Sequence, residues 1–332
     1  MEGDASSSEE VASFRTRSAT ECSVYCLRQP GCESFNACPG DLQGYPVTCE
    51  LFKKRVAHPK LIPSLCRYYE REHFSQETPL VCENGGVYLD DEDRCKCVGS
   101  YAGLTCQRIM RDCSEGYIDR VGKREQYFIQ PKDSPEAFEV HCNNQVDGGM
   151  TYIMHRTEWE FPRPDFYQNW QAYKEGFGTH YVNAWIGNEH LHQITRQGVY
   201  ELEVGVARYP EEFKYLYYEQ ISVGNESERY ALHLGPYFMG SFDGDSLTPS
   251  NDPQRNMNGK PFSTYDDDVS DNCAATLRAG WWFAEGCTAA NLHGPLSYPN
   301  SPRVYWQYPF GTDRITGVYM QIKAKSYYSD MP

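Results

Sequence analysis

The chain has 332 residues, of which 46 are Asp or Glu and 31 are Lys or Arg, so its formal net charge at pH 7 is −15. This acidic balance argues against a nucleic acid as the main partner, because binding to phosphates needs clustered Lys and Arg. The mean hydropathy is −0.68, and no stretch approaches the ~18 apolar residues that a membrane-spanning helix needs, which argues against membrane insertion. The length predicts at least two domains.

The cysteines are concentrated in the first third of the chain, where ten of the 14 precede residue 110. This distribution predicts small modules stapled by disulfides, followed by one large globular domain, in an oxidising compartment. A zinc site is disfavoured, because Cys22 and Cys26 have no second pair at ribbon spacing and Cys95-Lys-Cys97 is tighter than a C-x2-C knuckle.

The first 20 residues hold no apolar core of a signal peptide. Because the cysteines indicate secretion, we expect an extracellular protein whose signal peptide has been removed or whose N-terminal segment, residues 1–17, is truncated.

The first module is predicted to combine one helix with short strands. Residues 18–29 read as the helix, and Cys22 and Cys26 share one face of it because they are four positions apart. Segments 32–37 and 49–52 read as strands that each carry a cysteine. Helix cysteines opposite strand cysteines can staple the helix onto the sheet.

This pattern, with the closing Tyr68-Tyr69-Glu70, resembles the PAN/apple family over residues 18–73. PAN modules bind proteins or carbohydrates. The run Lys53-Lys54-Arg55, with Lys60, is either a polyanion-binding patch or a solvated basic loop. The resemblance implies the bridges Cys22–Cys49 and Cys26–Cys32, and leaves Cys38 to pair with Cys66.

A second module spans residues 78–108 and resembles the EGF-like family. The matching features are Cys82-Glu-Asn-Gly-Gly, Cys95-Lys-Cys97, Tyr101-Ala-Gly103 and Cys106. The family has six cysteines and this stretch has four, so one bridge is lost. The resemblance implies Cys82–Cys95 and Cys97–Cys106. The calcium signature of the family is missing, and we expect the module to act as a spacer.

The remaining chain shows both helical and strand periodicity. Phe166, Trp170, Tyr173 and Phe177 recur at helical spacing, which predicts one apolar helix face. The segment 200–206 alternates strictly, and similar alternation follows over 215–223 and 318–322, which predicts half-buried strands. An α+β domain with an antiparallel sheet follows.

Ordered motifs then make residues 111–326 resemble the fibrinogen C-terminal domain. These motifs include Asp147-Gly148-Gly149, DFYQNWQAYKEGFG at 165–178, Trp185-Ile-Gly-Asn-Glu189, Phe262-Ser263-Thr264, Asn272-Cys273-Ala274, Gly280-Trp281-Trp282 and Asn291-Leu-His-Gly294. The resemblance implies the bridges Cys113–Cys142 and Cys273–Cys287, so that no cysteine is left over. The expected fold class is therefore multidomain: a disulfide-rich α+β PAN/apple module, a small-β EGF-like module and an α+β fibrinogen C-terminal domain.

The same resemblance implies a calcium loop after Phe262-Ser263-Thr264. Asp266 and Asp268 would supply carboxylates, and main-chain carbonyls would complete the shell of about six to eight oxygens that Ca2+ prefers. The linker from Asp268 to Asn272 is shorter than in the family pattern. We expect a structural Ca2+ at these two aspartates; the alternative is an acidic, solvated loop.

A ligand pocket is implied beside this loop, and in many members it recognises acetylated sugars or other acetyl groups. Leu277 stands where the family has an aromatic residue, and Thr288 where it has a histidine. The remaining aromatic residues either form a hydrophobic wall or belong to the core, and His293 is expected to be structural. The expected pocket residues are Leu277, Trp282, Phe283, Thr288, Tyr298 and Tyr305.

Catalysis finds no support, because the sequence has no His-Glu-x-x-His, Gly-x-Ser-x-Gly or phosphate-loop motif. Asn225-Glu-Ser227 is a sequon and predicts N-glycosylation if the chain is secreted.

Our first hypothesis is a non-enzymatic, lectin-like recognition protein of innate immunity or cell adhesion that binds glycans or acylated ligands, with calcium shaping the pocket. The alternative is an adhesion or signalling ligand that binds a cell-surface or matrix protein. Homo-oligomerisation stays open.

Overall fold

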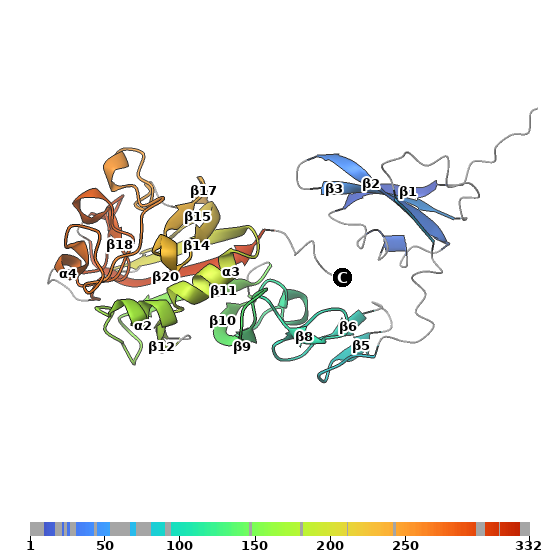
Figure 1. Ribbon diagram of the computed structural model, residues 1–332, viewed down its shortest axis with the longest axis horizontal. Helices are drawn as coiled ribbons and strands as arrows, with labels where there is room; N and C mark the ends of the chain where they lie inside the picture. Colours follow the sequence, from blue (N-terminus) through green and yellow to red (C-terminus); the bar gives the residue numbers. More distant parts are fainter. Residues whose placement is uncertain are drawn as a thin grey trace, which may run out of the picture. The chain divides into compact units, whose positions relative to one another are not determined.

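The structure is a computed structural model and describes residues 10–16, 22, 25–26, 31–42, 45–53, 67–70, 81–89, 94–145, 148–179, 182–210, 212–241, 244–296, 303–311 and 313–325. The chain divides into two compact units, one ending at Val81 and one over Cys82–Tyr328 (Figure 1). No helix among the described residues is long and apolar enough to cross a membrane. Each unit is described by itself below.

The N-terminal unit contains a four-stranded antiparallel sheet in the order β1-β3-β2-β4. The predicted strands at 32–37 and 49–52 lie largely within β2 and β3. Residues 1–17, expected only as a leading segment, contribute β1, because hydrogen bonding to β3 extends the ladder beyond what local periodicity indicates. The strands are β1 (Glu10–Thr16), β2 (Ser34–Leu42), β3 (Tyr45–Phe52) and β4 (Arg67–Glu70).

Two disulfides form much of the core of this unit. Cys22 and Cys26, whose backbone is helical, are joined to Cys49 and Cys32, respectively. These are the pairs that the PAN/apple resemblance implies. Phe35, Ala37 and Leu51 pack with them. The pairing of Cys38 with Cys66 and most of the basic loop after Lys53 lie outside the described residues.

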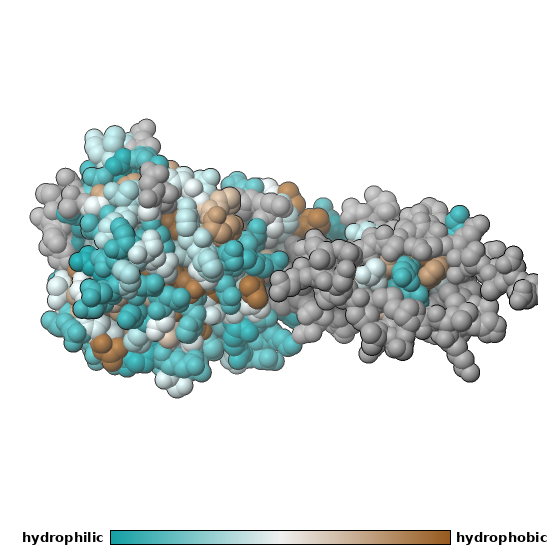
Figure 2. Space-filling view, turned by 90° about the horizontal axis from the view of Figure 1, so that it is seen from above, coloured by the Kyte–Doolittle hydropathy of each residue, from teal (hydrophilic) through white to brown (hydrophobic). Residues whose placement is uncertain are grey.

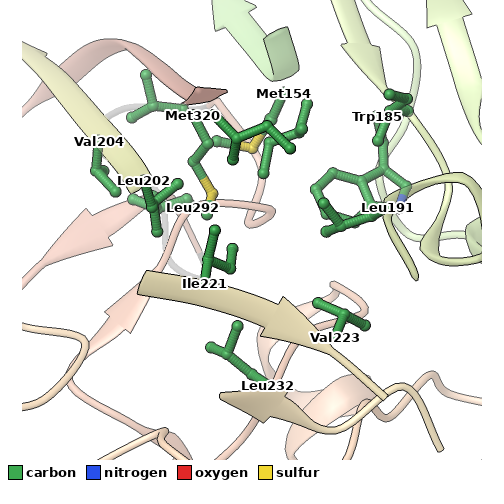
Figure 3. Packing of buried hydrophobic residues seen from close by; sticks show 14 of the residues in the cluster. Met154, Trp185, Leu191, Leu202, Val204, Ile221, Val223, Leu232, Leu292 and Met320 are labelled. Carbon is green, nitrogen blue, oxygen red and sulfur yellow. The ribbon is translucent and has the colours of Figure 1, made fainter. Parts of the chain in front are cut away.

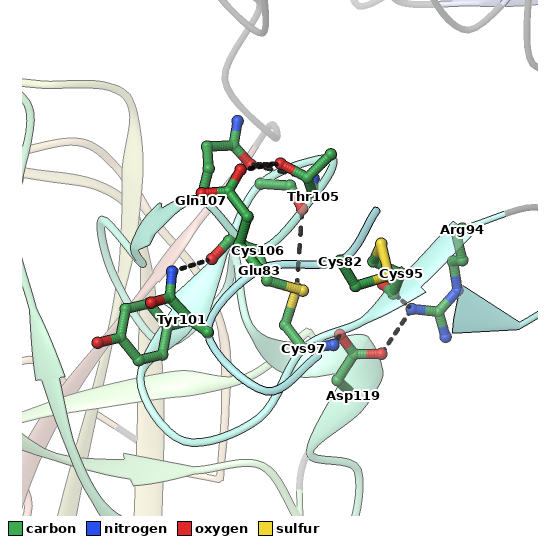
Figure 4. The surroundings of a disulfide bond; sticks show 12 residues. Cys82, Glu83, Arg94, Cys95, Cys97, Tyr101, Thr105, Cys106, Gln107 and Asp119 are labelled. Atoms are coloured by element: carbon green, nitrogen blue, oxygen red, sulfur yellow. Dashed lines mark hydrogen bonds and ion pairs between the residues drawn. A yellow bond between two sulfur atoms is a disulfide. The ribbon is translucent and has the colours of Figure 1, made fainter. Parts of the chain in front are cut away.

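The second unit begins with two short hairpins that are stapled by disulfides (Figure 4). Cys82 is joined to Cys95 and Cys97 to Cys106, as the EGF-like resemblance implies. We call residues 82–110 the disulfide module. Its strands are β5 (Val87–Leu89) with β6 (Arg94–Lys96) and β7 (Tyr101–Ala102) with β8 (Arg108–Ile109).

The large domain is built on an antiparallel sheet whose central strand comes from the end of the chain. β20 (Ile315–Ala324) lies between β11 (Met150–Thr157) and β14 (Tyr200–Arg208). β15 (Glu212–Val223) follows β14 by a tight hairpin. The remaining strands are β9 (Arg124–Ile129), β10 (Phe138–Asn143), β12 (Phe177–Thr179), β13 (Asn183–Trp185), β16 (Leu232–Leu234) and β17 (Tyr237–Gly240).

The register of the sheet brings apolar residues together on one buried face. Met320 lies opposite Met154 on one side and opposite Val204 on the other, and all three are buried (Figure 3). The strands predicted over 200–206, 215–223 and 318–322 are confirmed as β14, β15 and β20. The predicted half-buried alternation is wrong for β14, which is buried on both faces over 202–206, and β15 buries Leu216 and Tyr218 in place of Tyr215 and Tyr217. Figure 2 shows that the surface in view is mostly hydrophilic with isolated hydrophobic spots.

The helices are shorter than the sequence periodicity predicts. α2 (Trp170–Glu175) begins after Asn169, whose side chain accepts the N–H of Ala172, and ends at Gly176. Gly176 has φ 93°, and a Cβ there would lie 2.4 Å from the carbonyl oxygen of Ile186. The predicted helix face over 166–177 is therefore wrong in extent. The other helices are α3 (Asn188–Thr195) and α4 (Cys273–Leu277).

Two further disulfides and several short segments complete this domain. Cys113 is joined to Cys142 and Cys273 to Cys287, the two pairs that the fibrinogen-domain resemblance implies. The segments are β18 (Ala290–Asn291), β19 (Tyr305–Trp306) and the 3-10 turns η3 (Tyr117–Asp119), η4 (Glu226–Glu228), η5 (Pro253–Arg255) and η6 (Glu285–Cys287).

Candidate functional site

A pocket of about 440 Å³ opens beside the Cys273–Cys287 disulfide, and we call it the disulfide pocket. Its volume lies in the range of sites for small groups. Both apolar and polar residues line it. Its lining residues are Lys260, Pro261, Ser263, Val269, Ser270, Asp271, Cys273, Phe283, Ala284, Glu285, Gly286 and Cys287.

The backbone around the disulfide pocket adopts conformations that L-residues rarely take. Asp271 and Asn272, which precede α4, have φ values of 54° and 68°, and Cys287 and Thr288 have φ values of 72° and 93°. Each left-handed residue of this kind costs about 1–3 kcal/mol, and such residues cluster at functional sites. The disulfide fixes both strained segments to each other.

Three charged residues line the disulfide pocket, and we call them its rim. Asp271 and Glu285 are both exposed, and each lies two positions before one of the bridged cysteines. Lys260 supplies a positive charge on the same pocket. Sequence analysis missed these three residues, although an acidic residue two positions before each cysteine was a visible signal. The rim can therefore bind a ligand that carries both charge and apolar surface.

The predicted pocket residues do not form one wall. Phe283 lines the disulfide pocket, but Trp282 is fully buried and donates its indole N–H to the carbonyl of Tyr230 at 2.7 Å. Leu277 is partly buried and packs against the core. Tyr298 lies outside the described residues.

Thr288 and Tyr305 do not line the disulfide pocket. Thr288 is only 2% exposed, and the Tyr305 hydroxyl donates to its carbonyl oxygen at 3.3 Å. Burial raises the pKa of Tyr305 to about 12. Both residues therefore support the backbone of the second strained segment.

His293 is a core residue. Its Nδ1 lies 2.8 Å from the Gly280 carbonyl oxygen, and its ring packs against Trp185 and Trp281 at 4.6 Å between centroids. Burial, with the charge of Arg156 nearby, lowers the pKa of His293 well below its usual value. The imidazole is therefore neutral at physiological pH.

The two expected calcium ligands each cap a helix. An Asp266 carboxylate oxygen accepts the backbone N–H of Trp170, the first residue of α2, at 3.0 Å and the Thr264 hydroxyl at 2.8 Å. Asp268 accepts the N–H of Ala274 in α4 at 3.3 Å. First-turn N–H groups have no partner within their own helix, so these carboxylates satisfy them.

The loop over residues 264–271 does not fit a calcium shell. Its carbonyl oxygens at Thr264, Asp267 and Ser270 already accept backbone N–H groups, and calcium needs about six to eight oxygens. Among the described residues, no three His, Cys, Asp or Glu side chains converge as metal ligands.

A second pocket, of about 370 Å³, lies at the β14–β15 turn, and we call it the aromatic pocket. Trp159, Tyr209 and Phe213 line it, and their side chains are more than half exposed. Arg208 and Glu212 form an ion pair beside these rings. Sequence analysis did not identify this pocket.

A model of the family described as fibrinogen beta and gamma chains, C-terminal globular domain, matches residues 109–324. The chain belongs to this family. The matched residues agree with the domain expected over 111–326 within two residues at either end.

Similar proteins carry the same domain. Fibrinogen-like protein 1 of Bos taurus is 35% identical over 205 residues, which cover 59% of this chain and 64% of that protein. Fibrinogen-like protein A of Apostichopus parvimensis is 34% identical over 230 residues, with 67% of this chain and 75% of that protein covered. The structure of the fibrinogen-like globe domain of human ANGPTL2 superposes with a TM-score of 0.58 at 31% identity, and covers 65% of this chain and all of that one.

Proposed function

We propose that this protein is a secreted, non-enzymatic recognition protein whose fibrinogen C-terminal domain binds an extracellular protein through the disulfide pocket. We include in the proposal that residues 18–73 form a PAN/apple module and residues 78–108 an EGF-like module. The observation that carries the proposal is the charged rim of the disulfide pocket around an apolar floor.

The chemistry of the disulfide pocket favours a peptide segment over a neutral acetyl group. Asp271 and Glu285 suit a basic or N-terminal group, Lys260 suits a carboxylate, and Phe283 with the disulfide suits an apolar side chain. Interfaces gain specificity from complementary charge of this kind. The aromatic and histidine positions of the acetyl pocket are occupied by Leu277 and Thr288, which do not line this pocket.

Lectin-like binding of glycans is a second candidate, and the aromatic pocket favours it. Exposed aromatic rings present flat apolar faces on which sugar rings stack, and Trp159 is 67% exposed there. Arg208 and Glu212 offer hydrogen-bonding groups beside the rings.

The test is a parallel screen of the full chain against an array of extracellular proteins and an array of glycans. The proposal expects at least one protein ligand. Binding to glycans alone would contradict the proposal and favour lectin-like binding. If the folded protein binds to neither array, both candidate functions are contradicted.

A further inference from the structure

The three successive aspartates of the 264–271 loop are satisfied by protein donors. Asp266 accepts the N–H of Trp170, and Asp268 accepts the N–H of Ser270 at 2.6 Å together with its hydroxyl. Asp267 pairs with Arg229, whose Nη2 lies 2.7 Å from the carboxylate. A guanidinium therefore pairs with the middle aspartate of this loop, between the two carboxylates that the family resemblance assigns to a metal cation.

Arg229 contacts the loop through both its side chain and its main chain. Its Nη2 also donates to the carbonyl oxygen of Asp267 at 2.9 Å, and its own carbonyl oxygen accepts the N–H of Phe262 at 2.8 Å. Arg229 thus binds both Phe262, which precedes the loop, and Asp267 within it.

The guanidinium of Arg229 also reaches the helix that the loop caps. It lies 4.9 Å from the ring centroid of Trp170, within the range of a cation–π contact. The backbone N–H of the same Trp170 donates to Asp266, so Arg229 binds Asp267 directly and packs on the residue that Asp266 caps. A calcium ion at the Asp267 carbonyl would meet this positive charge directly.

We propose that Arg229 takes the place of calcium in the 264–271 loop, so that this wall of the disulfide pocket is formed without a divalent cation. Val269, Ser270 and Asp271, which follow the clamped aspartates, line the disulfide pocket. The inference rests on the proposed function only in treating this pocket as the recognition site, and it predicts that recognition persists in a chelator.

The test is hydrogen exchange of the full chain, followed in peptides that cover residues 263–274, because it needs no ligand and so fails independently of the proposed function. Wild-type protection should be the same in EDTA and in millimolar CaCl2. Arg229→Gln should make exchange in these peptides about two- to fivefold faster, the range that a partly exposed ion pair supports.

Arg314→Gln is the matched control. Arg314 also pairs with a carboxylate, Glu158, at 2.6 Å and lies 5.3 Å from an aromatic centroid, that of Tyr209, and its loss should leave residues 263–274 protected. The proposal is overturned if CaCl2 raises wild-type protection and Asp268→Asn abolishes that gain. It is equally overturned if Arg229→Gln leaves protection of these residues at the level of Arg314→Gln.

Discussion

Asp119 binds Arg94 across the boundary between the disulfide module and the large domain. An Arg94 guanidinium nitrogen lies 2.5 Å from one carboxylate oxygen of Asp119, and the backbone N–H of Cys97 donates to the other at 2.8 Å (Figure 4). The next residue, Arg120, is buried and donates to the carbonyls of Gly99 and Tyr101. Asp119 and Arg120, at the end of η3, therefore hold the disulfide module against the large domain. Its role as a spacer stays a prediction.

The first prediction concerns the contacts of Asp119 with Arg94 and Cys97. Asp119→Ala removes the acceptor of the Cys97 N–H and of Arg94, so the free energy of unfolding should fall by about 1–3 kcal/mol, the cost of leaving buried donors unsatisfied. Urea denaturation measures this change. As a control, Asp313→Ala removes a more exposed partner of Arg208 and should cost at most about 1 kcal/mol. Equal effects of the two variants would show that the contacts of Asp119 stabilise the protein no more than an exposed ion pair does.

The second prediction concerns Gly176 at the end of α2. Gly176→Ala should destabilise the protein by about 1–3 kcal/mol, because φ is positive and the Cβ would meet the Ile186 carbonyl. Gly122→Ala is the matched control, since φ there is also positive but no atom lies within 4 Å of the added Cβ. Unfolding midpoints in urea should be clearly lower for the first variant; identical midpoints would refute the close approach.

The third prediction concerns glycosylation at Asn225. Its side-chain oxygen accepts the N–H of Glu228 at 3.2 Å and the Ser227 hydroxyl at 2.6 Å, whereas a glycan attaches to the amide nitrogen. Secreted protein should therefore lose mass on treatment with an N-glycosidase. Ser227→Ala should abolish this shift and keep the cap to Glu228, while Asn225→Gln should also cost about 0.5–2 kcal/mol of stability. An unchanged mass of the secreted wild type would contradict the prediction.

The fourth prediction concerns pH. Burial lowers the pKa of His155, His190 and His293. Below an unfolded pKa of about 6.5 the unfolded chain binds protons that the folded chain does not, so stability falls as the pH drops. Urea denaturation at several values between pH 7.5 and pH 5 should show this loss.

Replacing His293 with Gln tests the origin of that pH dependence. The slope of stability against pH should decrease by up to about 1.4 kcal/mol per pH unit, whatever the change in stability itself. His233→Gln, at an exposed position of β16, serves as the control and should leave the slope as it is. A slope that is the same in both variants would assign the effect to other groups.

Much of the sheet could be predicted from the sequence, because alternation of apolar residues in β14 and β20 is typical of strands, although it does not show that β14 is buried on both faces over residues 202–206. The extent of α2 could not, because the aromatic period continues past Gly176 and only the close approach of Ile186 ends the helix there. β1 was missed for a related reason, since its partner β3 lies more than 30 residues further along the chain.

The site was harder to predict than the fold. Motif matching assigned Asp266 and Asp268 to a metal, which stays a prediction, but it could not show the protein donors of this loop. Asp266 accepts a hydrogen bond from Trp170, 96 positions away, and the neighbouring Asp267 is bound by Arg229, 38 positions away. No local pattern reports such distances. Of the predicted pocket residues that the structure describes, only Phe283 lines the disulfide pocket.

The most direct test of the account compares two variants in binding to the strongest ligand from the array screen. Asp271→Ala combined with Glu285→Ala removes the acidic rim of the disulfide pocket, and Trp159→Ala removes an exposed ring of the aromatic pocket. The account predicts that the first variant loses at least about tenfold in affinity, equivalent to ~1.4 kcal/mol, while the second binds like the wild type. Loss of binding in Trp159→Ala alone would contradict the central claim and place recognition at the aromatic pocket.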